Sequence, residues 1–534
     1  MKVAIVGSGV SGLAATWLLN EYTHHEVHLY EAGSRPGGHV NTATFVQPGK
    51  EPARVDTAFI VFNPIMYPNF VRFLQQYPSL RERIISTLMS FTVTRDGGAF
   101  MWASSCLRSF FCQSFRVFDP RMWRMLYDIV RFNACAPKLL MEPEPIDRDE
   151  ITVGEYIRRE GYSDFFKDNY LIPLTAAIWS TPPDKCALDF PARTLIRFFQ
   201  NHHLLSITKQ ATWFTFEGGS RMYVDHILSS LPAAHFHLST PVRSVSSVPS
   251  DRTESGSPYQ VELTTAAGER VLYDHVILAC HSNESLQILR NGGGVTADEE
   301  RILGSVEWTP NKVVLHCDER FMPPRRDLWS CWNYLTKPGA DSPGQGKPNA
   351  TNVSITFWMN VLQRLPMERH GLVLVTVNPP FEPDPAKVVG QFSFDHPVLS
   401  TKTIRAQQEI PSIQRTRGIS YAGGWMNYGF HEDGFTAGLR AASALLTGAH
   451  ADASKTKGRA PFPIVDADAL QAHRPVWYAG VLDAVETVGL RGVVGTLFCW
   501  LLGAARPIAG ALGVEGVKVV NAELRRDAAR GVVG

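Results

Sequence analysis

Short apolar runs alternate with a glycine-rich turn at the start of the chain. Residues 3–6 are apolar, the glycine-rich loop 7–12 follows, and residues 13–19 have the apolar spacing of a helix. A second apolar run at 27–30 ends on Glu31. This order predicts a strand, a tight turn, a helix and a second strand, which is the unit that binds a dinucleotide.

Each glycine of this loop has its own role in such a unit. Gly7 makes the tight turn, Gly9 lets the backbone approach a pyrophosphate, and Gly12 lets the helix pack closely on the strand. The free N–H groups at the helix N-terminus attract the pyrophosphate, and Glu31 is placed to accept hydrogen bonds from a ribose hydroxyl. A secretory signal peptide is not expected, because glycines and serines interrupt the apolar run that follows Lys2.

The apolar pattern changes several times farther along the chain. Between about 67 and 205 aromatic side chains recur at helical spacing, and after 300 strand-like runs predominate. Residues 259–263 and 270–273 predict a hairpin. The fold class is therefore predicted as α/β, with a discontinuous Rossmann-type domain and an inserted α+β substrate domain. We expect the first domain at 1–66, 211–300 and 401–448, a mainly helical cap at 67–210, a substrate-side sheet at 301–400, and a C-terminal tail at 449–534.

The composition excludes several classes of protein. With 534 residues the chain is too long for one simple core, and 44% apolar and 19% charged residues are typical of a globular protein. A formal net charge of +1 gives no indication of nucleic-acid binding. The eight cysteines are scattered without a CxxC pair, so we expect reduced thiols in a cytoplasmic protein. No metal site is expected, since His202, His203, His281 and His396 also lack companions at metal-ligand spacing.

One C-terminal segment complicates this picture. Residues 492–505 carry no charge and lie between Arg491 and Arg506. The segment is shorter than the roughly 20 residues that a membrane span needs. Two interpretations stay open: a helix buried in the protein or in an interface, and a helix that lies in the plane of a membrane.

Three separated motifs resemble those of the flavin-containing amine oxidase superfamily over residues 1–447. They are the N-terminal loop with Glu31 and Arg35-x-Gly37-Gly38, the middle segment 240–242, and Tyr421-Ala422-Gly423-Gly424 before a helix. Within the superfamily the chain looks most like a group of predicted NAD/FAD-binding proteins, some of which are linked to fatty-acyl desaturation. The stretches that carry this closer resemblance are 177–180, 217–221, 279–282, 332–334 and 429–434.

The resemblance implies FAD as the cofactor and a site assembled from three distant segments. It places Ser11 and Arg35 at the phosphates, Val242 at the adenine, Gly424 beside the pyrophosphate and ribitol, and the helix that begins near His431 at the flavin O2 and N1. The residues expected to bind FAD are Gly7, Gly9, Ser11, Gly12, Glu31, Arg35, Gly37, Gly38, Val242, Gly424, His431, Asp433 and Phe435.

Lys312 is the candidate catalytic residue. Its strand looks like the one on which amine oxidases place a lysine that contacts flavin N5 through water, whereas the alternative is an exposed lysine at the start of a strand. Phe430 stands where the resemblance implies an aromatic-cage tyrosine, which argues against simple amine oxidation. His39 follows the double glycine, and we expect it to form a hydrogen bond near the ring rather than a covalent link.

These features predict a FAD-dependent oxidoreductase. It would take a hydride from a C–H bond of an apolar small molecule (lipid, fatty-acyl or polyketide-like) onto flavin N5, with dioxygen or another acceptor to reoxidise the flavin. Two alternatives stay open: an amine oxidase that releases an imine and hydrogen peroxide, and a flavin-binding protein with a redox-sensing role and no turnover.

Overall fold

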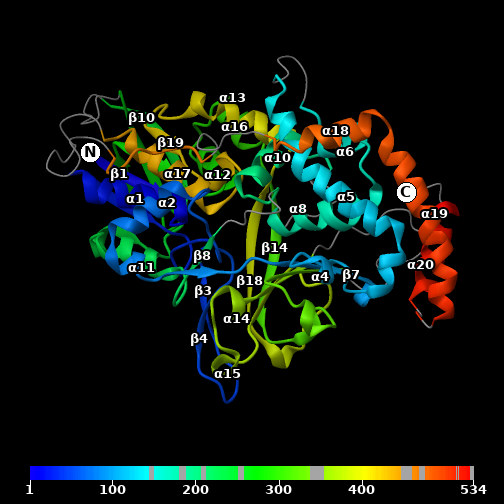
Figure 1. The fold of residues 1–534 in the computed structure, drawn as a ribbon. Coiled ribbons are helices and arrows are strands. Elements are labelled where there is room, and N and C mark those ends of the chain that lie inside the picture. The colour runs from blue at the N-terminus through cyan, green and yellow to red at the C-terminus, as the bar shows by residue number, and fades with distance from the viewer. Residues whose placement is uncertain are drawn as a thin grey trace.

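The computed structural model describes residues 1–143, 150–179, 188–205, 212–250, 258–336, 354–446, 460–467, 475–512, 514 and 516–529. Ser180 of the stretch 177–180 and Cys186, one of the eight cysteines, lie outside this range. Figure 1 shows the N-terminal elements at one side of the molecule and the C-terminal helices α19 and α20 at the other.

Five parallel strands form the sheet that carries the glycine-rich loop. Their spatial order is β9-β2-β1-β13-β19. They are β1 (Lys2–Val6), β2 (Glu26–Tyr30), β9 (Phe236–His237), β13 (His275–Leu278) and β19 (Ile419–Tyr421). The sheet thus combines strands from all three predicted segments of the Rossmann-type domain. Because parallel strands end at one edge of a sheet, the loops after β1, β2 and β13 lie near one another.

Two helices far apart in the sequence cross in close contact beside this sheet. α1 (Val10–Tyr22) follows the glycine loop, and α17 (His431–Ser443) follows β19. A Cβ added at Gly438 would lie 2.0 Å from the carbonyl oxygen of Ser11, and one at Gly434 would lie 2.6 Å from Val10 Cγ1. Only glycine at these two positions lets the backbones approach so closely, and this contact brings the start of α17 to the start of α1.

A small antiparallel sheet and a large mixed sheet contain most of the other strands, and β3 (Thr42–Phe45) pairs separately with β4 (Ala53–Asp56). The small one contains β10 (Val242–Pro249), β11 (Tyr259–Thr265) and β12 (Arg270–Tyr273), which confirms the predicted hairpin. The large one has the order β18-β14-β17-β16-β15-β6-β7. Its strands are β6 (Phe91–Arg95), β7 (Phe100–Ala103), β14 (Glu307–His316), β15 (Trp332–Leu335), β16 (Ser354–Trp358), β17 (Leu374–Val377) and β18 (Val388–Val398).

The region predicted as a mainly helical cap also contains strands. β6 and β7 belong to the large sheet, where β6 pairs with β15 in parallel, and β5 (Ile84–Thr87) pairs with β8 (Trp213–Phe216). The run Phe91-Thr92-Val93-Thr94 combines an aromatic residue with β-branched residues, which favour strands over helices. The aromatic content that suggested helices therefore serves a sheet in this part of the chain.

The helices of this region and of the C-terminus lie to one side of β14 and β18 of the large sheet (Figure 1). The longer helices outside the α1–α17 pair, together with the short α4, are α2 (Pro68–Gln76), α4 (Leu107–Phe110), α5 (Pro120–Cys135), α8 (Ile172–Trp179), α10 (Ala192–Asn201), α11 (Arg221–Ser229), α12 (Ser282–Asn291), α16 (Thr401–Ile413), α18 (Ala479–Thr487), α19 (Leu490–Ala511) and α20 (Val517–Ala529). α5 contacts both α18 and α19, so the C-terminal helices lie against the cap.

The apolar C-terminal segment differs from both its predicted length and one of its interpretations. α19 has 22 residues, because the helix continues through Arg506 and Pro507, and only 6% of its most apolar window is buried. The part of the first interpretation that buries the helix in the protein is therefore wrong, whereas a helix in an interface stays a prediction. By length and composition alone, α19 is the one helix among the described residues that can cross a membrane.

We expect Gly438→Ala to destabilise the fold by about 1–3 kcal/mol, because its Cβ must displace the backbone of Ser11. Chemical denaturation of the purified protein measures this change. Gly480→Ala is the matched control, since Gly480 also lies in a helix but a Cβ there would meet no atom within 4 Å. The control should be neutral or slightly stabilising. Equal stability of both variants would contradict the close α1–α17 contact.

Candidate functional site

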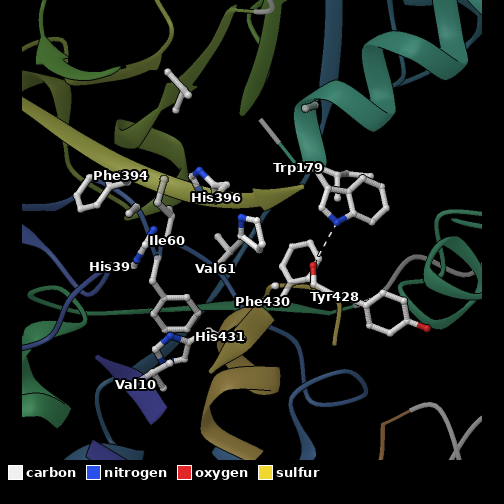
Figure 2. A pocket seen from close by; sticks show the side chains of 18 of the residues that line it. Val10, His39, Ile60, Val61, Trp179, Phe394, His396, Tyr428, Phe430 and His431 are labelled. Carbon is white, nitrogen blue, oxygen red and sulfur yellow. Dashed lines mark hydrogen bonds between the residues drawn. The ribbon is translucent and has the colours of Figure 1, made fainter. Parts of the chain in front are cut away.

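One cavity of about 1290 Å³ runs from the glycine-rich loop to the helices of the cap. Gly9 and Glu31 line it at one end, and Leu126 and Ile129 of α5 line it at the other. Figure 2 shows its middle part, where His39, Phe394 and His396 lie together and Trp179, Tyr428 and Phe430 form a second group. A cavity of this size and extent has room for a large cofactor and a substrate.

The glycine-rich loop has the geometry that a pyrophosphate needs. Gly7 has φ +101, and a Cβ there would lie 2.9 Å from the carbonyl oxygen of Ala279. A Cβ at Gly12 would lie 1.9 Å from the carbonyl oxygen of Gly7, so this position must stay small for α1 to pack. In contrast, Gly9 lines the cavity, and a Cβ there would meet no protein atom within 4 Å. Gly9 therefore leaves space for a ligand at the helix N-terminus, where Ser11 also lines the cavity.

The second glycine pair packs over this loop. A Cβ at Gly38 would lie 3.1 Å from Gly9 Cα, and the Gly37 N–H donates to the carbonyl oxygen of Ser8 at 3.0 Å. Arg35 donates to the carbonyl oxygens of Gly38 at 2.8 Å and of Val40 at 3.3 Å. Arg35 was predicted to face the phosphates, but it is not among the described residues that line the cavity. Its guanidinium instead holds the loop that contains the two glycines.

Glu31 lies at the end of β2 and lines the cavity. Its carboxylate accepts hydrogen bonds from the backbone N–H groups of Ser8 at 3.0 Å and Gly33 at 2.7 Å. These bonds fix the side chain beside the glycine loop, and a carboxylate has further lone pairs for a ribose hydroxyl. Val242, at the start of β10, also lines this end of the cavity. The two residues predicted for the adenosine half are thus brought together.

The start of α17 closes the middle of the cavity. Gly424 and His431 line it, and the His431 ring stacks on Phe59 with centroids 3.7 Å apart. Asp433, predicted to bind the cofactor, is turned to the helix end, where it accepts from the backbone N–H of Phe430 at 2.8 Å. Phe435, also predicted, is fully buried in the core beside α2. Among the five residues 431–435, only the first therefore lines the cavity, because one helical turn points its side chains in different directions.

Glu432 has a structural role, as its position at a helix start predicts, but the helix that it caps is not its own. Its two carboxylate oxygens accept from the backbone N–H groups of Asn69 at 2.9 Å and Phe70 at 3.0 Å, at the first turn of α2. Burial raises the pKa of Glu432 to about 8. The side chain caps α2 and joins it to α17. The aromatic side chains of α2 then pack against Phe59 and His431.

Two histidines in the cavity have tautomers fixed by the main chain. Asn311 Nδ2 donates to the Thr309 carbonyl oxygen at 3.1 Å and also contacts His396 Nδ1 at 2.7 Å. Since a carbonyl only accepts, the amide nitrogen faces both groups, and His396 Nδ1 is the acceptor. His39 Nε2 lies 3.1 Å from the Asp395 carbonyl oxygen, so that nitrogen carries the proton. The neutral rings thus offer different atoms: His396 keeps an Nε2–H donor, and His39 keeps an Nδ1 acceptor.

The environment keeps both imidazoles neutral. Desolvation lowers the pKa of His396 to about 4 and that of His39 to about 3; His281 lowers both further, and His396 also lowers that of His39. The ring centroids are 5.3 Å apart. A hydrogen-bond donor and an acceptor therefore lie side by side in the cavity at neutral pH, next to His281, whose pKa is also lowered by desolvation.

The far end of the cavity is an apolar chamber. Its walls are the aromatic and aliphatic side chains Trp102, Phe110, Leu126, Ile129, Val130, Tyr170, Leu174, Ile178, Trp179, Phe198, Trp332, Phe357 and Phe430. The rings contact one another, as Phe198 does with Trp179 at 4.6 Å and with Phe430 at 4.9 Å between centroids. Among the described residues of this chamber no side chain is charged. It therefore favours an apolar ligand over a charged one.

The structure does not bring Lys312 to the cavity. Its Nζ pairs with Glu382 at 3.1 Å, and the side chain is 41% exposed. Val313, the next residue of β14, lines the cavity instead. Successive side chains of a strand point to opposite faces, so the predicted strand is placed correctly but its register is shifted by one residue. We therefore do not include Lys312 among the residues proposed to act in catalysis.

A cluster of possible metal ligands lies outside the cavity, where the sequence indicated no metal site. Glu26, His28 and His235 offer ligand atoms within 4.8 Å of one another. However, both His28 nitrogens already have partners: Glu26 at 2.8 Å and His237 at 3.0 Å. These hydrogen bonds account for the cluster as a link between β2 and β9.

Comparisons with solved structures identify the fold. The chain is similar to a fatty acid isomerase from P. acnes that produces CLA, with TM-score 0.54 and 12% identity, over 83% of this chain and 98% of that one. It is also similar to cyclohexylamine oxidase from Brevibacterium oxydans, with TM-score 0.56 and 15% identity over the same shares. A putative protoporphyrinogen oxidase from Exiguobacterium gives TM-score 0.52 and 15% identity, again over 83% and 98%. At such identities the likeness shows the fold.

Sequence comparison identifies the family. Among curated proteins none matches the chain significantly. The family of flavin-containing amine oxidoreductases, however, matches residues 10–446, which run from the end of the glycine loop through the large sheet to α17. This match confirms the predicted fold class, the FAD cofactor and the assignment as an enzyme, and it removes the alternative of a flavin-binding protein without turnover. The chain belongs to the flavin-containing amine oxidoreductase family and is a FAD-dependent oxidoreductase that acts on a small molecule.

Proposed function

We propose that this enzyme removes a hydride from a C–H bond of a neutral, apolar small molecule of the lipid, fatty-acyl or polyketide class. The observation that carries this proposal is the continuity of the cavity: the space beside Gly9 and Glu31 leads into a chamber with aromatic and aliphatic walls. A carbon chain in that chamber would lie in a dry environment that rewards burial of apolar surface.

The proposed positions of FAD follow from the residues that line the cavity. Gly9, Ser11 and Glu31 would hold the phosphates and the adenosine ribose, and Val242 the adenine. Gly38, Gly424 and His431 would lie beside the remainder of the cofactor. When bound, FAD supplies the acceptor for two electrons and a proton, so that the substrate loses a hydride and a second proton, and dioxygen or another acceptor takes the electrons afterwards.

The chain itself positions the substrate. The apolar chamber binds the substrate and excludes water from it. His39 Nδ1 is an acceptor and His396 Nε2–H is a donor, so the pair can hold a polar group of the substrate by hydrogen bonds. Because desolvation lowers the pKa of both rings, they act as neutral groups, and the second proton of the substrate is released to solvent.

Amine oxidation is the second candidate, because the family match and the aromatic rings both favour it. Trp179 and Phe430 have centroids 6.1 Å apart, and the faces of such rings attract cationic or polarised amines. Against it, the apolar chamber has no carboxylate among its described residues to balance a cationic amine. We therefore rank oxidation of a neutral substrate first.

The proposed location is the cytoplasm, with contact to a membrane. The described cysteines are all free, including the buried Cys135 and Cys331 and the exposed Cys106 and Cys499. Free thiols of this number fit a reducing compartment. The membrane contact would be made by the exposed apolar face of α19.

Anaerobic mixing of the FAD-loaded enzyme with a panel of fatty acids and amines tests the substrate class. We expect long-chain fatty acids or their thioesters to bleach the flavin absorbance at about 450 nm. Simple amines should leave this absorbance unchanged. Bleaching by amines with later release of hydrogen peroxide would support the second candidate instead.

Leu126→Glu should weaken the use of an apolar substrate by about 10- to 100-fold in kcat/KM, because it places a charge in the chamber wall. Leu126→Met is the control with similar volume and should retain activity. Unchanged kinetics in the glutamate variant would contradict the assignment of this chamber to the substrate.

Gly9→Val should abolish retention of FAD by filling the space beside the helix N-terminus, while the protein still folds because that space holds no protein atom. The flavin spectrum and the circular dichroism of the purified variant measure the two effects separately. Gly480→Val places the same side chain at an open helix position away from the cavity and should retain FAD. A yellow Gly9→Val protein would refute the proposed site.

The pH dependence of stability tests the histidine pair. The pKa of His396 is about 4 in the folded protein and 6.5 in the unfolded chain. The contribution of His396 to stability is therefore complete above pH 6.5. It is lost as the pH falls from 6.5 towards 4, since only the unfolded chain then binds the proton. His396→Gln should reduce the slope of stability against pH in this window by up to about one proton. Parallel curves for both proteins, from thermal unfolding, would contradict a neutral buried His396.

A further inference from the structure

The outer face of α19 is a continuous apolar surface. Six large side chains on it are between 54% and 75% exposed: Val493, Val494, Leu497, Trp500, Leu501 and Ile508. At 100° per residue these positions fall within an arc of about 120°, so they share one face of the helix. Such a patch of large apolar side chains is unusual on a soluble surface and marks a site of interaction.

The opposite face of α19 is fixed to the protein. The Phe498 ring contacts Trp123 with centroids 5.6 Å apart, and Ala509 is buried. α20, which contacts α19, is bound to the cap through ion pairs of Arg116 with Glu523 at 2.8 Å and of Arg121 with Asp527 at 2.6 Å. The apolar face therefore points outward because the other side of the helix pair is already packed.

The charges of this segment favour an anionic lipid surface as the partner. Arg491 and Arg506 are the charged residues of α19, and no acidic residue occurs between positions 487 and 514. Arg491 pairs with Glu486 at 2.9 Å, so Arg506 supplies the excess positive charge. Apolar side chains flanked by cations match the interface of a bilayer that contains anionic lipids. The helix can cross a membrane by length and composition, but its packing along α5 and α20 favours a position in the plane of the interface.

The opening of the cavity lies on the same part of the molecule. Leu88 and Leu107 line the cavity and are 70% and 65% exposed. A series of ring contacts leads from the cavity wall to α19: Trp102–Phe110, Phe110–Phe111, Phe111–Trp123 and Trp123–Phe498, with centroids 4.8–5.7 Å apart. Exposed leucines at an opening near the apolar helix suit substrates that are dissolved in lipid.

We propose that α19 lies in the interfacial region of an anionic lipid bilayer and that the cavity opens beside it, so that apolar substrates pass from the bilayer into the chamber. The second half rests on the proposed function, whereas the first half stands on the helix itself. Leu497 and Trp500 form the centre of the docking face, and Leu88 and Leu107 lie at the opening.

Co-sedimentation with vesicles tests the docking face. The FAD-loaded enzyme should bind vesicles of phosphatidylcholine with phosphatidylserine, and bind vesicles of phosphatidylcholine alone more weakly. The double variant Leu497→Glu/Trp500→Glu should lose binding by at least about tenfold, because two buried charges are costly in the interface. Both residues are exposed, so the variant should fold and keep its flavin. Leu272→Glu, at a 48% exposed position of β12, is the control and should bind normally.

Each other outcome overturns the docking proposal. Absence of vesicle binding by the wild type, or equal binding by the double variant, would refute a role for α19. A wild-type dimer that the double variant dissociates, without any vesicle binding, would show that the face joins two copies of the chain. Resistance of the bound enzyme to extraction at high pH would show a spanning helix rather than one in the plane.

Labels at the opening and on the docking face test the orientation of the opening. Cys106 lines the cavity at the opening and is exposed. A hydrogen bond from the Ser109 backbone lowers the pKa of Cys106, which favours its labelling. Cys499 lies about 160° around the helix from Leu497, away from the docking face, so it is changed to serine and Leu497→Cys supplies the thiol on the face. With an environment-sensitive fluorophore on one of these two thiols and the other absent, vesicles should shift the emission of both labels to the blue. A shift at position 497 alone would refute delivery from the bilayer while keeping the docking face.

The two proposals fail in distinguishable ways. Vesicle binding and label shifts do not depend on turnover, so they hold even if no fatty acid bleaches the flavin. Conversely, bleaching by a soluble short-chain substrate without vesicle binding would leave the proposed function intact and remove the docking face.

Discussion

The close crossing of α1 and α17 is the constraint on which the site depends. At Gly438 the helix backbones approach until a single methyl group would collide with the Ser11 carbonyl oxygen. This contact joins the glycine loop after β1 to His431, which stands more than four hundred residues later in the chain. Without it, the glycine-loop end of the cavity and its middle, both of which FAD requires, would have no fixed relation. Glu432 extends the same contact to α2, and so to Phe59 under the His431 ring.

Main-chain carbonyls give the middle of the cavity its chemistry. The Thr309 carbonyl oxygen orients Asn311, which determines the nitrogen of His396 that carries a proton. The Asp395 carbonyl oxygen does the same for His39 directly. Asn378 donates to Asn311 Oδ1 at 2.6 Å and thereby holds the amide in that orientation. The tautomers are thus a property of the β14–β18 pair, and the histidines meet the cofactor and substrate already oriented.

The sequence predicts local motifs well and distant contacts poorly. The glycine loop, Glu31 and the 270–273 hairpin follow from short-range spacing, and the structure contains them as expected. Lys312 was misplaced because an apolar strand shows where it lies but not which residues face the cavity. The Asn311–His396 contact joins residues 85 positions apart, and no pattern in the sequence marks it.

The C-terminal helix is a second feature whose distant contacts the sequence does not predict. Composition identified an apolar segment, but whether a face of α19 is covered depends on α5 and α20, which pack on one side only. Arg116 is 1% exposed although it is charged; it pairs with the nearby Asp119 at 3.1 Å and with Glu523 of the last helix at 2.8 Å. A buried cation with a partner four hundred residues away cannot be recognised from spacing.

The order of the strands in the parallel sheet has a consequence for biosynthesis. β1 and β2 leave the ribosome first, yet β13, which pairs with the other side of β1, and β19, which pairs with β13, follow hundreds of residues later. During translation, the open edge of β1 must therefore wait while the cap is made, and the open edge of β13 must wait while most of the large sheet is made. Such long-range pairing slows folding and exposes strand edges in the meantime. One edge of the parallel sheet thus stays open until β19 has been synthesised.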